Sequence, residues 1–92
     1  MAGIANRQFE ELAQNGLKYL TWASDVEIFL GSKELKKVIG IGSQAAIDAV
    51  TPAQNAEALH FLRHHLCSTL KNEYMAERSA LDLWNALKQR FE

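Results

Sequence analysis

Four side chains that could bind a metal ion or take part in catalysis lie close together in the second half of this chain. Glu57, His60 and His64 occupy positions i, i+3 and i+7, and Cys67 follows one helical turn later. On a helix these groups share one side, and Glu-x-x-His spacing is typical of metal sites in helical bundles. A dinuclear site needs a second such motif, which the sequence lacks, whereas a mononuclear site is geometrically possible. The sequence favours the competing interpretation, a solvated polar face, so we expect no metal and no cofactor.

Cys67 is the only cysteine among the 92 residues and a candidate nucleophile. Nucleophilic catalysis needs an adjacent base and an orienting group. His64 lies one turn away, but no oxyanion-stabilising element accompanies it, so a small buried or half-buried thiol is the simpler interpretation. Gly40-Ile41-Gly42 is too short for a dinucleotide-binding fingerprint and follows no predicted strand. We therefore predict that the chain is not an enzyme and has no catalytic residues.

Apolar periodicity predicts the elements that must position these groups. The first helix carries a stripe at i, i+4, i+7 and i+8, formed by Trp22, Val26, Phe29 and Leu30. Gly31-Ser32 should end it, and Ser32 should cap a short helix over 33–39. The inward side chains of that short helix should be Leu35, Val38 and Ile39. A glycine-rich breaker cluster follows, and residues 40–51 have no clear prediction.

Capping signals mark the remaining helices. Thr51 precedes Pro52, and Gln54 completes a possible capping box, so a helix should run from Pro52 to about Cys67. A short helix is expected over 68–75. Ser79 followed by Asp82 should open the last helix, whose apolar stripe is Ala80, Trp84, Leu87 and Phe91. Because no segment alternates with period two, we predict an all-α fold, a compact bundle of about five short helices.

Both ends of the chain should contribute to one core, because each carries a tryptophan among leucines. At this spacing tryptophans are more often buried than exposed as binding anchors. The predicted structural core is Tyr19, Trp22, Val26, Phe29, Leu35, Ile39, Leu59, Leu62, Leu66, Leu70, Trp84, Leu87 and Phe91.

Composition and charge restrict the class of protein. The length suits one domain over 1–92, with residues 1–14 as a flexible lead or a short helix. A net charge of −1 and an acidic residue inside the Lys33-Lys36-Lys37 cluster argue against direct nucleic-acid binding. A lone cysteine fits a reducing compartment, so we expect the cytoplasm or nucleus. No signal peptide or membrane span is predicted, and no membrane partner is expected.

Three stretches resemble, in the same order, the Gag polyproteins of copia-type LTR retrotransposons, with plant sequences nearest. Asn15-Gly16-x-x-Tyr19-Leu20-x-Trp22 is similar to the family's opening NGxNYxxW element. The stretch 58–66 resembles the helix that follows it. Leu81-Asp82-Leu83-Trp84-Asn85-Ala86-Leu87 with Phe91 is similar to the xELWxxLxxxF signature. The family usually has Ser-Asn at Leu17-Lys18, and often a second aromatic after the leucine where Lys36 follows Leu35.

The resemblance implies a capsid-forming Gag domain with a fold like the N-terminal domain of retroviral capsid proteins. Its function would be homotypic self-assembly into virus-like particles, so the implied partner is a second copy of the chain, giving at least a dimer. RNA would be bound only by regions outside this chain, because the sequence contains no zinc knuckle. The main alternative is a domesticated Gag-derived helical adaptor that binds another protein, and a direct nucleic-acid binder is a third.

Overall fold

Helices make up the regular structure of residues 10–92, the part of the chain that the computed structural model describes. The predicted all-α class is therefore confirmed, whereas most of the predicted lead over 1–14 lies outside the described residues. The elements in order are α2 (Tyr19–Ser32), the 3-10 helix η1 (Lys36–Ile39), α3 (Gln44–Asp48), α4 (Pro52–His64), α5 (Ser68–Glu73) and α6 (Ala80–Phe91).

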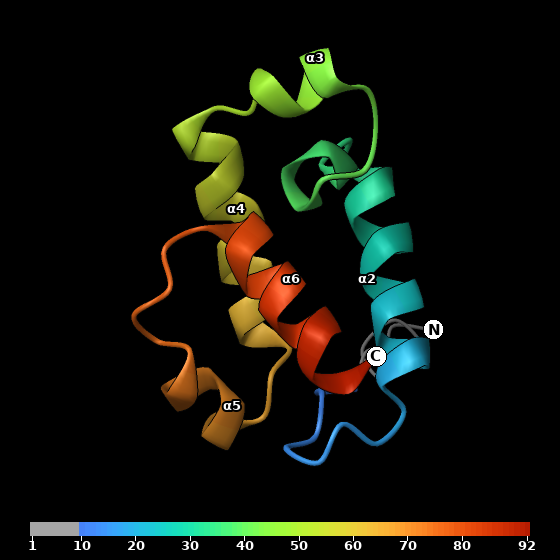
Figure 1. The fold of residues 1–92 in the computed structure, drawn as a ribbon, viewed down its shortest axis with the longest axis vertical. Helices are drawn as coiled ribbons and strands as arrows, with labels where there is room; N and C mark the ends of the chain where they lie inside the picture. The colour runs from blue at the N-terminus through green and yellow to red at the C-terminus, as the bar shows by residue number, and fades with distance from the viewer. Residues whose placement is uncertain (1–9) are drawn as a thin grey trace, which may run out of the picture.

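Three longer helices form the body of the bundle. In Figure 1, α6 crosses in front of α4 while α2 runs along the other side, with α3 at one end and α5 at the other. The short helix η1 packs against α2, α3, α4 and α6, so it joins the longer helices at one end of the core. The C-terminal end of α6 lies beside the first turn of α2 (Figure 1), which brings the two tryptophan-containing segments together.

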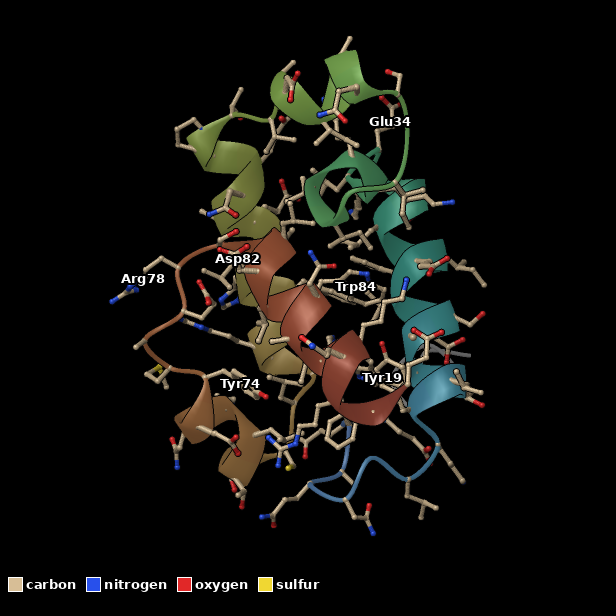
Figure 2. The ribbon with its side chains drawn as sticks, in the orientation of Figure 1. Tyr19, Glu34, Tyr74, Arg78, Asp82 and Trp84 are labelled. Atoms are coloured by element: carbon tan, nitrogen blue, oxygen red, sulfur yellow. The ribbon has the colours of Figure 1, made fainter. Side chains whose placement is uncertain are left out.

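The core lies between α2, α4 and α6. Figure 2 shows Trp84 on the side of α6 that faces α2, and its ring stacks against Trp22 with centroids 6.1 Å apart. Tyr19 packs on Phe91 at 5.8 Å, and burial, together with Glu92 and Glu27 nearby, raises the pKa of the Tyr19 hydroxyl to about 12. Buried residues beyond the predicted core are Leu12, Leu30, Val38, Ala58, Ala80 and Leu83.

Two residues predicted in the core, Phe29 and Phe91, are only partly buried. Phe29 stacks on Phe61 at the surface between α2 and α4, and Phe91 closes the last turn of α6 over Tyr19. The other predicted core residues are buried. Helical spacing identified the correct stripe, but the edge of a stripe borders solvent.

Local capping chemistry begins two of the longer helices where predicted. The Thr51 hydroxyl accepts a hydrogen bond from the Gln54 amide at 3.1 Å, and the Gln54 side chain accepts one from the Thr51 amide at 3.0 Å, which is a complete capping box. Ser79 accepts from the Asp82 amide at 3.1 Å at the start of α6. Both features confirm the predicted starts.

Ser32 is not a helix cap, contrary to prediction. It is the last residue of α2, and its hydroxyl donates to the Phe29 carbonyl at 2.6 Å. Glu34 then adopts a left-handed conformation with φ 59°, which lets the Leu35 amide donate back to Leu30 at 2.7 Å. This turn uses residues 33–35, so the helix expected over 33–39 is reduced to η1.

A long-range backbone contact ends α4 at His64, earlier than the predicted Cys67. The Leu12 amide donates to the His65 carbonyl at 2.9 Å, and the Cys67 amide donates to the Leu12 carbonyl at 3.0 Å. These bonds form an isolated parallel bridge between Leu12 and Leu66, and they use backbone groups that a longer helix would need. The following helix, α5, likewise ends at Glu73 rather than at residue 75.

Candidate assembly surface

The outer face of α2 is the largest concentration of exposed apolar side chains among residues 10–92. Leu20 and Ile28 are each 69% exposed, and Leu17, just before the helix, is 66% exposed. Met75, at 45%, is the remaining large exposed hydrophobic residue of this part of the chain, and it follows α5. We call the surface formed by Leu17, Leu20, Ser24 and Ile28 the outer α2 face.

The opposite face of α2 already supplies the packing that the fold needs. Its buried residues are Tyr19, Trp22, Val26 and Leu30. A surface helix of a globular protein normally has one apolar stripe and a polar face opposite. Because α2 carries large apolar residues on both sides, its outer face is not explained by the core of the monomer.

A tight turn before α2 places Leu17 at the surface. Asn15 accepts a hydrogen bond from the Leu17 amide at 2.9 Å, and Lys18 has a left-handed conformation with φ 63°. Gly16 also has a positive φ of 76°, and the Phe91 ring occupies the space where a Cβ would stand. Glycine is therefore required at this position by both conformation and packing.

The outer α2 face can contribute free energy by burial but offers no group for chemistry. Burying a Leu or Ile side chain completely contributes about 1.5–3 kcal/mol. About two thirds of each of the Leu17, Leu20 and Ile28 side chains is exposed. A contact between two copies that buried all six side chains would gain roughly 6–12 kcal/mol before the cost of association is subtracted. Association costs on the order of 4–15 kcal/mol, which is comparable to that gain, so the net free energy of such a contact would be small.

The structure does not bring the four candidate chemical groups into a site. His60 and His64 are exposed on α4 with ring centroids 5.9 Å apart, Glu57 is exposed, and Cys67 is half-buried beyond the end of the helix. Within residues 10–92 no three His, Cys, Asp or Glu side chains converge in a way that could hold a metal ion.

A small groove between α2 and α4 lies beside these histidines and has mostly apolar walls. Its volume is about 270 Å³, and its floor includes the Phe29–Phe61 stack, whose rings lie 4.2 Å apart and nearly parallel. Lys33 lies over the Phe29 ring at 5.7 Å. His65 packs on Phe61 at 4.5 Å, and burial, assisted by the neighbouring His64, lowers the pKa of His65. The groove is smaller than the usual range of about 300–1,000 Å³ for ligand pockets.

The outer α2 face was not predicted from the sequence, because the prediction for this helix concerned only its inward apolar stripe. Its signal was nevertheless present, because Leu17, Leu20 and Ile28 lie off that stripe. The predicted lysine cluster is divided: Lys33 is exposed, whereas Lys36 and Lys37 are half-buried. The Lys36 stem lies about 3.1 Å from where a Cβ on Gly31 would stand, so part of this cluster packs against α2.

Comparison with known proteins identifies no relative. No family model matches the sequence, and no curated protein or solved structure matches it either. Across residues 10–92, no helix has both the length and the apolar character needed to cross a bilayer. The function must therefore be inferred from the motifs and from the surface that the fold exposes.

Proposed function

We propose that this chain is a Gag-like capsid domain of a copia-type LTR retrotransposon, and that its function is homotypic self-assembly into virus-like particles. The observation that carries the proposal is the ordered resemblance of three sequence stretches to that family. The domain acts by packing and assembly rather than by catalysis, and RNA binding belongs to regions outside this chain. Its place of action is the cytoplasm or nucleus.

The spatial arrangement of the three stretches supports this proposal. The first and third meet where Trp22 stacks on Trp84 and where Phe91 fills the space above Gly16. The second stretch, 58–66, contacts the first through His65, the residue that follows α4. The His65 carbonyl accepts a hydrogen bond from the Trp22 indole at 3.0 Å. Residues that carry the resemblance therefore form one packing unit, as expected if they define a shared fold.

The exposed outer α2 face gives an independent reason for assembly. Assembly domains combine many weak contacts, and avidity then multiplies modest affinities. A helix with Leu20 and Ile28 exposed on its outer side can supply such a contact. The near-neutral net charge of −1 means that copies of the chain do not repel one another strongly.

Light scattering across a concentration series tests the proposal. We expect the scattering mass of the purified chain to rise with concentration between about 10 µM and about 1 mM, because homotypic contacts of this size are weak. A chain that remains monomeric throughout, yet forms a stable complex with one different protein, would instead favour the domesticated adaptor. Salt-sensitive binding to RNA with a steep slope would favour a nucleic-acid binder.

A further inference from the structure

The groove between α2 and α4, which we call the α2–α4 groove, has a floor of two stacked phenylalanine rings. Phe29 of α2 and Phe61 of α4 lie with their ring centroids 4.2 Å apart and their planes 4° apart. The buried side chains of Leu30 and Leu35 contribute to its apolar walls. Its volume of about 270 Å³ is below the usual range for ligand pockets, but it suits one aromatic side chain.

On the α4 side, the backbone bridge at Leu12 directs the preceding part of the chain toward this groove. The Leu12 amide donates to the His65 carbonyl at 2.9 Å, and the two segments run parallel. Going back along the chain from Leu12 therefore follows the same direction as going back from His65 into α4. Phe61 lies one turn before His65, and the two rings are in contact at 4.5 Å.

On the α2 side, the first described residues point the same way. Glu10 and Glu11 line a surface hollow together with Trp22 and Asp25 of α2. Phe29 follows Asp25 by four residues, which is about 6 Å along a helix. Two residues of extended chain span roughly the same distance, at about 3.3 Å each. Counting back two residues from Glu11 thus reaches the level of the Phe29–Phe61 stack.

The residue at that position in the sequence is Phe9, which is the only aromatic residue among the first nine. It is uncharged, so its burial between the rim residues Lys33 and Glu57 removes no ion from water. Phe9 is three residues from the anchored Leu12. So short a tether gives an effective concentration on the order of millimolar, which favours this side chain over an occupant from solution.

We propose that the Phe9 side chain of the same chain occupies the α2–α4 groove and packs on the stacked rings of Phe29 and Phe61. The contact ties the start of the chain to α2 and α4 together, and it withdraws the aromatic floor from water. The α2–α4 groove is then closed to a second copy, so homotypic assembly uses other surfaces. This inference goes beyond the proposed function and does not depend on it.

A double-mutant cycle in urea unfolding tests the contact. Phe9→Ala should lower the urea midpoint of the parent, and it should lower the midpoint of a Phe61→Ala chain by less than about half as much, because residues in contact are not additive. Phe61→Leu takes the place of Phe61→Ala if circular dichroism shows that the alanine variant is unfolded. Leu17→Ala, at an exposed apolar position before α2, is the matched control and should have the same effect in both backgrounds. Equal effects of Phe9→Ala in the two backgrounds would overturn the proposal.

Photo-crosslinking identifies the occupant. With p-benzoylphenylalanine in place of Phe9, irradiation should link position 9 to a peptide that contains Phe29 or Phe61 of the same chain, as read by mass spectrometry of the monomer band. The same probe in place of Leu17 should not label those peptides. Links to the groove that appear only in a covalent dimer would assign the groove to Phe9 of a second copy and overturn the proposal. Links that avoid both phenylalanine peptides would overturn it as well.

Discussion

Replacing Trp22 tests how the two ends of the chain are joined. The indole stacks on Trp84 at 6.1 Å and donates to the His65 carbonyl at 3.0 Å. Trp22→Phe keeps an aromatic ring but removes the hydrogen bond, which contributes about 0.5–1.5 kcal/mol, and part of the buried ring. The free energy lost with the hydrogen bond should lie near the lower end of that range, because the His65 carbonyl still accepts a bond from the Leu12 amide at 2.9 Å.

We therefore expect Trp22→Phe to lower the free energy of unfolding by about 1–3 kcal/mol, including the lost packing. Trp22→Ala should cost about 4–6 kcal/mol, which approaches the whole stability of a domain of this size, about 5–14 kcal/mol. The assay is urea unfolding followed by circular dichroism at 222 nm, roughly the helix minimum. Thr21→Ala, at an exposed position in the same turn, is the control and should change stability by less than about 0.5 kcal/mol.

A Trp22→Ala chain that unfolds at the same urea concentration as the parent would refute this reasoning. It would mean that the tryptophan is not buried between α2 and α6, and the convergence of the end segments would be wrong. Trp84→Ala gives a second reading of the same contact, with an expected cost of about 3–5 kcal/mol.

Three further changes test separate contacts. Gly16→Ala should lower the free energy of urea unfolding by about 2–4 kcal/mol, because Gly16 has a positive φ and an added Cβ would overlap the Phe91 ring. The loss should be smaller in a Phe91→Ala background, and an equal loss in both backgrounds would contradict the overlap. Arg63→Met should lower the free energy of unfolding by about 2 kcal/mol, because the guanidinium donates to the Met75 and Glu77 carbonyls at 2.7 and 2.6 Å. The control, Arg78→Met, changes an exposed residue and should leave stability nearly unchanged. Because the pKa of His65 is lowered from its ordinary 6.5, the unfolded chain takes up the proton first, so the free energy of unfolding should decline as pH falls below 6.5. His65→Gln should flatten that decline in a pH series of urea unfolding, and an unchanged slope would assign it to other groups.

Local chemistry made the helix starts predictable. The capping box of Thr51 and Gln54 and the Ser79 cap each depend on residues three positions apart, so the sequence contains all the participants. Periodicity likewise identified the inner faces of α2 and α6, because burial against one core follows the helical repeat.

Long-range contacts were beyond the reach of local patterns. The end of α4 depends on Leu12, which bonds to His65 and Cys67 from a distant part of the chain. The turn after α2 depends on Glu34 adopting a left-handed conformation that a glycine would have signalled more clearly. Helix propensity reports neither effect, since the first is a long-range backbone contact and the second is a local turn through a left-handed residue that is not glycine.

The candidate surface was predictable in part. Leu20 and Ile28 are visible in the sequence as apolar residues outside the stripe of Trp22 and Val26. Their exposure became evident only when the fold placed the opposite side of α2 against α4 and α6. The histidines of α4 illustrate the reverse case, because their helical spacing was correct but no further ligand from residues 10–92 meets them.

Sedimentation equilibrium of the 92-residue chain measures self-association, the central claim, most directly. We predict a weight-average mass that starts near the monomer value of 10.3 kDa at about 10 µM and rises toward or beyond twice that value at about 1 mM. A mass that stays at 10.3 kDa over the whole range, for a chain shown to be folded, would contradict homotypic assembly.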